Sequence, residues 1–140
     1  MIRFVLDASV ALAWLVDHSP ASYAIKIEQL LYAGRGQAVV PSLWELEVAN
    51  GFITAERRGI LTPVDTAQIL TSFEAVIKQA VEIASAPISM RRAINAARGS
   101  GLTAYDAVYL ELARELQLPI ATLDRRLAEA AKHVGVRLVQ

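Results

Sequence analysis

The amino-acid sequence predicts an α/β domain in which a mainly parallel sheet lies between two layers of helices. The first indication is that short apolar runs alternate with longer segments of helical pattern, as in parallel sheets that are covered on both faces. The second is that 140 residues with a hydrophobic fraction of 54% suffice for one packed core. The chain also shows no repeat, low-complexity stretch or linker, so we expect a single domain over residues 1–140.

Five short, apolar runs are the candidate strands. They cover residues 2–6, 37–40, 81–84, 119–123 and 136–139. The third run is the weakest, and Pro41 and Pro119 mark the end of the second run and the start of the fourth. Because ligands bind beyond the carboxyl ends of parallel strands, the residues that follow these runs are the first place to look for chemistry.

Helical patterns fill the intervals between the strands. They cover residues 9–16, 20–33, 42–58, the segment from Thr62 onward, 88–98, 103–117 and 125–133. Thr62 is a predicted N-cap, followed by Pro63 at the first helical position and Asp65 in the first turn. Thr103 is predicted to cap the helix that reaches Gln117, and the GSG sequence to break the helix before it.

Composition limits the class of protein. Cysteine is absent, which excludes a disulfide framework, a thiolate nucleophile and a thiolate metal site, and suits a reducing cytosol. The formal net charge is zero, so any contact with nucleic acid must come from local arginines or a bound metal. Asp7 interrupts the apolar N-terminal stretch, and the residues from there to Asp17 are too few for a membrane span or a good signal core. We therefore expect a soluble, cytoplasmic protein.

Two acidic residues follow predicted strands directly. Asp7 comes after the run FVL, and Asp124 comes after IATL. Each also precedes a predicted helix, so each carboxylate has an ordinary alternative role as an N-cap that accepts backbone N–H groups. For either residue taken alone, capping is the favoured interpretation.

Two further acids lie on helices. Asp106 shares a helical face with apolar residues three, four and seven positions on, so it points to the core side of its helix unless it forms a capping box with Thr103. In the sequence SLWE, Ser42 and Glu45 have the spacing of a capping box, which gives Glu45 a structural role. Glu47 has no such role, although a solvated helix position remains its alternative.

The sequence therefore places Asp7, Glu47, Asp106 and Asp124 near one edge of the predicted sheet. Four carboxylates in one cleft would repel one another and raise each other's pKa values. A divalent cation would remove that conflict, and carboxylate oxygens are suitable ligands for Mg²⁺ or Mn²⁺. Spacing alone leaves open whether the four side chains converge.

Four segments together resemble the motifs of the PIN-domain family, specifically its VapC-type toxins. They are VLDASVALAW, PSLWELEVAN, LTAYDAVYLELA and IATLDRRL, in the family's order and over nearly the whole chain. The resemblance implies a three-layer α/β/α fold and a single PIN domain. It also implies an Mg²⁺- or Mn²⁺-dependent endoribonuclease, a cognate VapB-type antitoxin as partner and a homodimer.

Carried over by position, the resemblance assigns the catalytic and metal-binding roles to Asp7, Glu47, Asp106 and Asp124. Ser9, Thr103 and Thr122 stand where the family has small hydroxyl residues that support the acids, and Asn50 would be a partner of Glu47. Leu127 occupies a place that is often aromatic. The implied reaction is hydrolysis of an RNA phosphodiester by a metal-activated water.

Other functions remain as alternatives to this one. They are a PIN nuclease of housekeeping type and a PIN-like module without turnover, while a receiver domain would need a lysine that VRLVQ lacks. Seven arginines are candidates for phosphate contact, although most of them are expected on solvated helix faces: Arg125 and Arg126, which follow Asp124, and Arg57, Arg58, Arg91, Arg92 and Arg98. His18 and His133 are expected in loop or surface positions. Four aromatic residues are expected in the core: Trp14, Trp44, Phe52 and Phe73.

Overall fold

In the computed structural model, which describes residues 1–140, four parallel strands form the central sheet. The strands are β1 (Ile2–Leu6), β2 (Gly36–Val40), β3 (Val81–Ile83) and β4 (Ile120–Ala121), in the order β3-β2-β1-β4. β1 is central and fully buried from Phe4 to Leu6, because both of its edges are paired and both faces are covered. All four carboxyl ends lie at one edge of the sheet.

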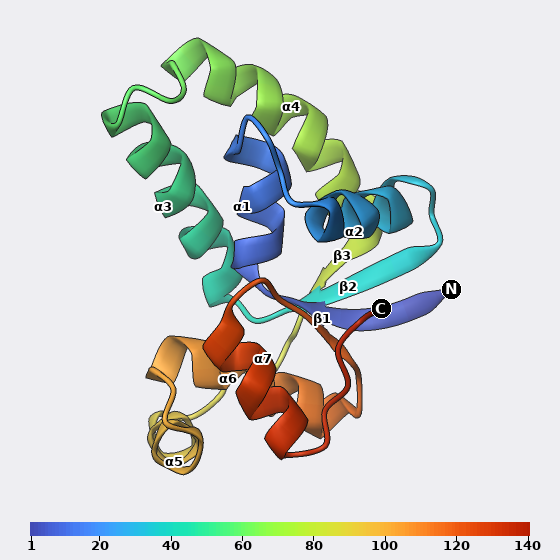
Figure 1. Cartoon of the computed structure of the whole chain (residues 1–140), viewed down its shortest axis with the longest axis vertical. Helices are drawn as coiled ribbons and strands as arrows, with labels where there is room; N and C mark the ends of the chain where they lie inside the picture. The colour runs from blue at the N-terminus through green and yellow to red at the C-terminus, as the bar shows by residue number, and fades with distance from the viewer.

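Seven helices cover the sheet, as Figure 1 shows: α1 to α4 lie on one side and α5 to α7 on the other. They are α1 (Ala8–Val16), α2 (Ser22–Tyr32), α3 (Leu43–Arg57), α4 (Pro63–Ala80), α5 (Met90–Ser100), α6 (Ala104–Leu116) and α7 (Arg125–His133). The predicted α/β/α architecture is confirmed. No helix is long and apolar enough to cross a membrane.

The four aromatic residues that were expected in the core are all buried. Phe73 of α4 lies between two tryptophans, with ring centroids 6.0 Å from Trp14 and 6.0 Å from Trp44. Edge-to-face and tilted pairs at this separation add stabilisation beyond the area that they bury. These contacts fix α1, α3 and α4 against one another, and therefore fix the helices that begin at the site.

Three local predictions require correction. Ser42 has helical backbone angles (φ −59°, ψ −28°) and makes no capping bond, so the predicted capping box with Glu45 is wrong. The helix predicted to break at GSG continues through Gly99 and Ser100, and ends at Gly101 with φ +72°. The run PIATL pairs over only two residues, because the segment from Thr122 onward turns to bind side chains described below.

The last predicted strand, over residues 136–139, is reduced to one isolated bridge between Leu138 and Ile120. Thr62 behaves as predicted: its hydroxyl accepts the Asp65 N–H, and the Asp65 carboxylate accepts the Thr62 N–H. The hydrogen bond from the Thr62 backbone is the main cause that lowers the pKa of Asp65.

Gly51 marks a close crossing of α1 and α3, because a Cβ atom at this position would overlap both Cδ atoms of Leu12. We expect Gly51→Ala to lower the free energy of unfolding by about 1 kcal/mol, since overpacking outweighs the gain in helix propensity. Gly99→Ala is the matched control: it is also helical, but its added Cβ would meet nothing within 4 Å. Urea unfolding should show opposite signs for the two variants; equal effects would contradict the close crossing.

Candidate functional site

Asp7 follows β1 and is almost completely buried, with 4% of its surface exposed. Its Oδ2 accepts hydrogen bonds from the Ser9 hydroxyl (2.5 Å) and the Thr122 hydroxyl (2.8 Å). Although Asp7 occupies the N-cap position of α1, its side chain caps no backbone N–H group. The capping interpretation is therefore wrong for Asp7, and its Oδ1 has no hydrogen-bond partner in the protein.

The loop after β4 is tied to Asp7 through two hydroxyl groups. The Thr122 hydroxyl accepts the Asp124 N–H (3.0 Å), and the Ser9 hydroxyl accepts the Leu123 N–H (3.1 Å). The two hydroxyls lie 3.5 Å apart. This network places Asp124 beside Asp7 and accounts for the short β4. Asp124 caps α7, because its Oδ1 accepts the Leu127 N–H (3.1 Å), and this leaves Oδ2 free.

Glu47 lies half-buried on α3 and accepts a 2.6 Å hydrogen bond from the Tyr109 hydroxyl on its Oε1. Tyr109 itself is completely buried on α6. Burial raises the pKa of the Tyr109 phenol first, and its bond to Glu47 raises it further, so the phenol is a donor at all working pH values. Asn50 is exposed and makes no hydrogen bond to Glu47.

Glu47 was predicted partly from a capping box that the structure does not contain, and Tyr109 was counted only among the apolar residues on the helical face of Asp106. One signal pointed to Tyr109: a tyrosine on the buried face of a helix needs a partner for its hydroxyl. Tyr109 lies three residues after Asp106 on the same helical face, so that partner was to be sought at the site.

Asp106 is half-buried in the first turn of α6. Its backbone N–H donates to the Thr103 hydroxyl (3.2 Å), but its carboxylate does not return a bond to Thr103. The capping box is thus only half formed, although the Thr103 hydroxyl lies close enough to the Asp106 carboxylate to lower its pKa, against the larger effect of burial. Of the predicted supporting residues, Ser9 and Thr122 contact an acid directly, and Thr103 fixes the helix that carries one.

The four carboxylates form one electrostatic unit. Burial is the main cause that raises the pKa values of Asp7, Glu47 and Asp106. Neighbouring negative charges raise these pKa values further. The pKa of Asp7 is raised by Asp106 and Asp124, that of Glu47 by Asp7 and Asp106, and that of Asp106 by Asp124. None of the ion pairs in the protein includes any of the four acids. The cluster holds negative charge without a basic partner.

This donor set suits a hard divalent cation. Asp7 Oδ1, Glu47 Oε2 and Asp124 Oδ2 accept no hydrogen bond from the protein, and the Asp106 carboxylate has only the Thr103 hydroxyl beside it. No three acidic or histidine side chains stand close enough to form a ready-made coordination group. Mg²⁺ usually retains several waters, so carboxylates that are spaced more widely can still bind it through water. The histidines, His18 and His133, are exposed and take no part.

Three comparisons relate the chain to known proteins. The family model described as PIN domain matches residues 4–133. Ribonuclease VapC3 from Pyrobaculum aerophilum is 35% identical over 131 residues, which cover 91% of this chain and 94% of that protein. The crystal structure of PAE2754 from the same organism superimposes with a TM-score of 0.69, at 22% identity over 92% of this chain and 84% of that chain, and supports the fold.

Proposed function

The chain belongs to the PIN domain family, and on this premise we propose that it is a metal-dependent endoribonuclease, the toxin of a VapC-type toxin–antitoxin pair. One observation carries the proposal: four carboxylates from four separate segments lie at the carboxyl edge of the parallel sheet, where they raise one another's pKa values and have no basic partner. A fold of this size has no structural need for such an arrangement, because each buried or repelled charge costs stability. The relative's name, a ribonuclease, supports the same activity.

Asp7, Asp106 and Asp124 would hold Mg²⁺ or Mn²⁺ through their free oxygens, directly or through water, with Glu47 completing the negative pocket. A cation bound there supplies a water of lowered pKa and neutralises charge on the phosphodiester. The protein's part is orientation. Ser9 and Thr122 fix Oδ2 of Asp7 and so aim Oδ1, while the Leu127 N–H does the same for Asp124.

Glu47 is fixed in the same way by the Tyr109 hydroxyl on its Oε1, and its carboxylate lies near enough to Asp7 and Asp106 for their charges to raise its pKa. In this position it can accept a proton from, or orient, a water beside the phosphodiester. We expect hydrolysis by water without a covalent enzyme intermediate, because the chain contains no cysteine and the hydroxyl of Ser9 is held between the Asp7 carboxylate and the Leu123 N–H. Ser9 is already engaged as a donor to Asp7.

The direct test is incubation of the purified protein with single-stranded RNA and Mg²⁺ or Mn²⁺, with chelator, and beside an Asp106→Asn variant. We expect cleavage with metal and none with chelator or the variant. Equal cleavage by the variant would point to a contaminating nuclease and overturn the assignment. Failure of the wild-type protein to cleave any RNA, with metal binding intact, would favour a PIN-like module without turnover.

The remaining features of the proposal follow from the same family premise. We place the protein in the cytoplasm as one PIN domain over residues 1–140, neutralised by a VapB-type antitoxin and active as a homodimer. A small open reading frame beside the gene, whose product copurifies with this chain and suppresses cleavage, would support the pairing. Light scattering on the purified protein tests the dimer.

Tyr109 is the positioning residue that this mechanism adds. We expect Tyr109→Phe to lower the rate of RNA cleavage by about tenfold, in the range found when outer partners of ligand groups are removed. The loss arises because Glu47 would retain its place on α3 but lose the donor that orients it. The thermal midpoint should change little, since the ring stays packed. Cleavage rates measured over a range of Mg²⁺ concentrations distinguish a positioning role from a merely structural one. A higher Mg²⁺ requirement of the variant supports positioning, and an unchanged cleavage rate contradicts it.

A further inference from the structure

A cavity of about 590 Å³ lies between the carboxyl end of α5 and the outer face of α7. Arg125, Arg126 and Glu129 line it from α7, and Gly99 and Gly101 line it from the end of α5. Its volume is sufficient for part of a polynucleotide chain, and it contains none of the four site acids.

The two arginines in this cavity are not neutralised. Arg3, Arg92 and Arg114 all form ion pairs within 4 Å, but Arg125 and Arg126 form none. Glu129, one turn further along α7, also lines the cavity without pairing to either of them. Unpaired guanidinium groups at the wall of a cavity are suited to bidentate binding of phosphate.

Both walls of the cavity continue directly into the acidic site. Arg125 follows Asp124, the acid that caps α7. On the opposite wall, Leu102 precedes Thr103, whose hydroxyl caps α6 at the N–H of Asp106. A ligand chain in the cavity would therefore lie beside the two segments that carry Asp124 and Asp106.

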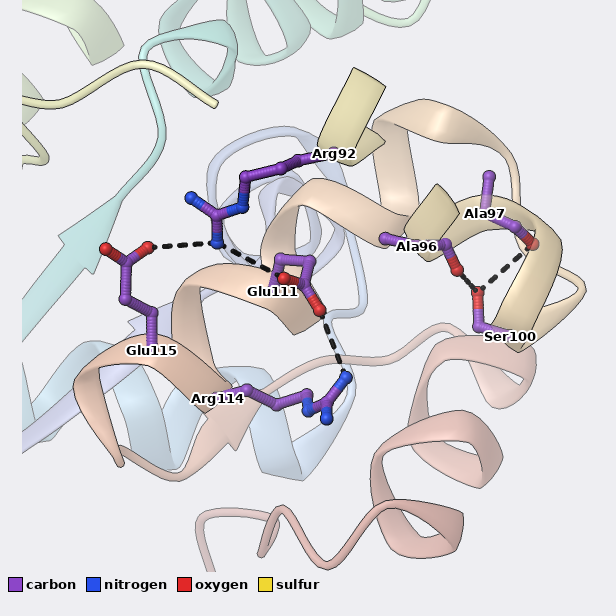
Figure 2. Close-up of polar contacts among 7 residues, drawn as sticks. All are labelled: Arg92, Ala96, Ala97, Ser100, Glu111, Arg114 and Glu115. Atoms are coloured by element: carbon purple, nitrogen blue, oxygen red, sulfur yellow. Dashed lines mark hydrogen bonds and ion pairs between the residues drawn. The ribbon is translucent and has the colours of Figure 1, made fainter. Parts of the chain in front are cut away.

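The α5 wall contributes shape and no charge. Figure 2 shows the Ser100 hydroxyl turned back onto its own helix, where it donates to the carbonyls of Ala96 (2.7 Å) and Ala97 (3.5 Å). The same figure shows Arg92 joining α5 to Glu111 (3.3 Å) and Glu115 (3.5 Å) of α6, which fixes the wall in place. Cβ atoms added to Gly99 or Gly101 would meet nothing within 4 Å, so this rim is open to a ligand.

We propose that this cavity binds the RNA backbone next to the cleaved bond, with Arg125 and Arg126 contacting its phosphates. The inference rests on the proposed function and names where the substrate strand leaves the acidic site. It also resolves a difficulty of charge: a protein of zero net charge whose site repels phosphate must hold RNA by local cations. Arg125 and Arg126 are unpaired cations that line the same cavity and follow the site acid Asp124 directly in the sequence.

The test measures binding of a fluorescent single-stranded oligoribonucleotide by anisotropy, in an Asp7→Asn background that does not cleave it. Arg125→Gln and Arg126→Gln should each weaken binding about fivefold near 0.1 M salt. Each should also reduce the slope of log affinity against log salt by about 0.7, the value for one phosphate contact on a single strand. Glu129→Gln should tighten binding, because it removes the negative charge from the same wall.

The matched control is Arg35→Gln, an exposed and unpaired arginine that precedes β2 at the opposite edge of the sheet. It should leave both affinity and salt slope unchanged. If the double variant of Arg125 and Arg126 binds RNA with unchanged affinity and slope, the cavity assignment is overturned. If the arginine variants lose binding while the wild-type protein cleaves no RNA, the proposed function fails and the cavity assignment stands.

Discussion

Replacing Asp7 by asparagine is expected to reduce RNA cleavage at least a hundredfold and to leave the protein as stable as, or more stable than, the wild type. The loss of rate follows because a cation's contribution to the transition state is worth several kcal/mol, and each 1.36 kcal/mol is a factor of ten. The substituted side chain would present a neutral amide in place of the free, charged Oδ1. Its amide oxygen can still accept the hydrogen bonds of Ser9 and Thr122, so the local structure should persist.

The stability of the variant follows from the burial of Asp7. The side chain is 4% exposed, has no basic partner, and has a raised pKa because burial disfavours its charged form. A neutral side chain of the same size removes that penalty at neutral pH. Urea unfolding in the presence of chelator should therefore give a free energy of unfolding that is equal to or higher than that of the wild type.

Asp17→Asn provides the matched control, since Asp17 is an exposed aspartate at the opposite end of α1. It removes the same charge and should change neither cleavage nor stability. Near wild-type cleavage by Asp7→Asn would contradict the site, and so would a variant that loses both activity and much of its stability, because Asp7 would then be a structural anchor.

Much of this site was predictable because the strands are parallel. Once Phe4–Leu6 and the run before Thr122 were recognised as buried strands, Asp7 and Asp124 had to lie at the same edge of the sheet. The periodicity of α6 likewise placed Asp106 on the inward side of its helix. The hydrophobic patterns of strands and helices repeat every two to four residues, so they can be recognised within a short stretch of one sequence.

The contacts that hold the acids in place were harder to predict, because they join segments far apart in the chain. Tyr109 donates to Glu47 across 62 positions, and Thr122 donates to Asp7 across 115. The length of β4 depends on the second of these bonds, since Thr122 turns away from the sheet to make it. The false capping box at Ser42 has a related cause: the turn after Pro41 puts Ser42 in helical conformation, which leaves its hydroxyl unable to cap.

Mg²⁺ is expected to raise the thermal midpoint of the protein at pH 7, and this effect should diminish as the pH falls. An ion that binds only the folded state stabilises it by about 2.7 kcal/mol at a concentration of 100 times Kd. Asp7, Glu47 and Asp106 have raised pKa values, chiefly because they are buried, so protons compete with the ion at higher pH than for ordinary carboxylates. Thermal scans with Mg²⁺ and with chelator, between pH 7 and pH 4, measure the difference.

Without metal, the contribution of these groups to stability should instead increase as the pH falls. A carboxyl whose pKa is higher in the folded than in the unfolded state favours folding at low pH. This contribution is complete below the unfolded-state pKa, 3.8 for aspartate and 4.5 for glutamate, and is lost as the pH rises through the folded-state pKa. In chelator, the advantage of Asp7→Asn over the wild type should therefore shrink on acidification, while Asp17→Asn should follow the wild type throughout. If Mg²⁺ raised the midpoint of Asp7→Asn as much as that of the wild type, the ion would bind elsewhere, because Asp7 is the most deeply buried ligand of the proposed site.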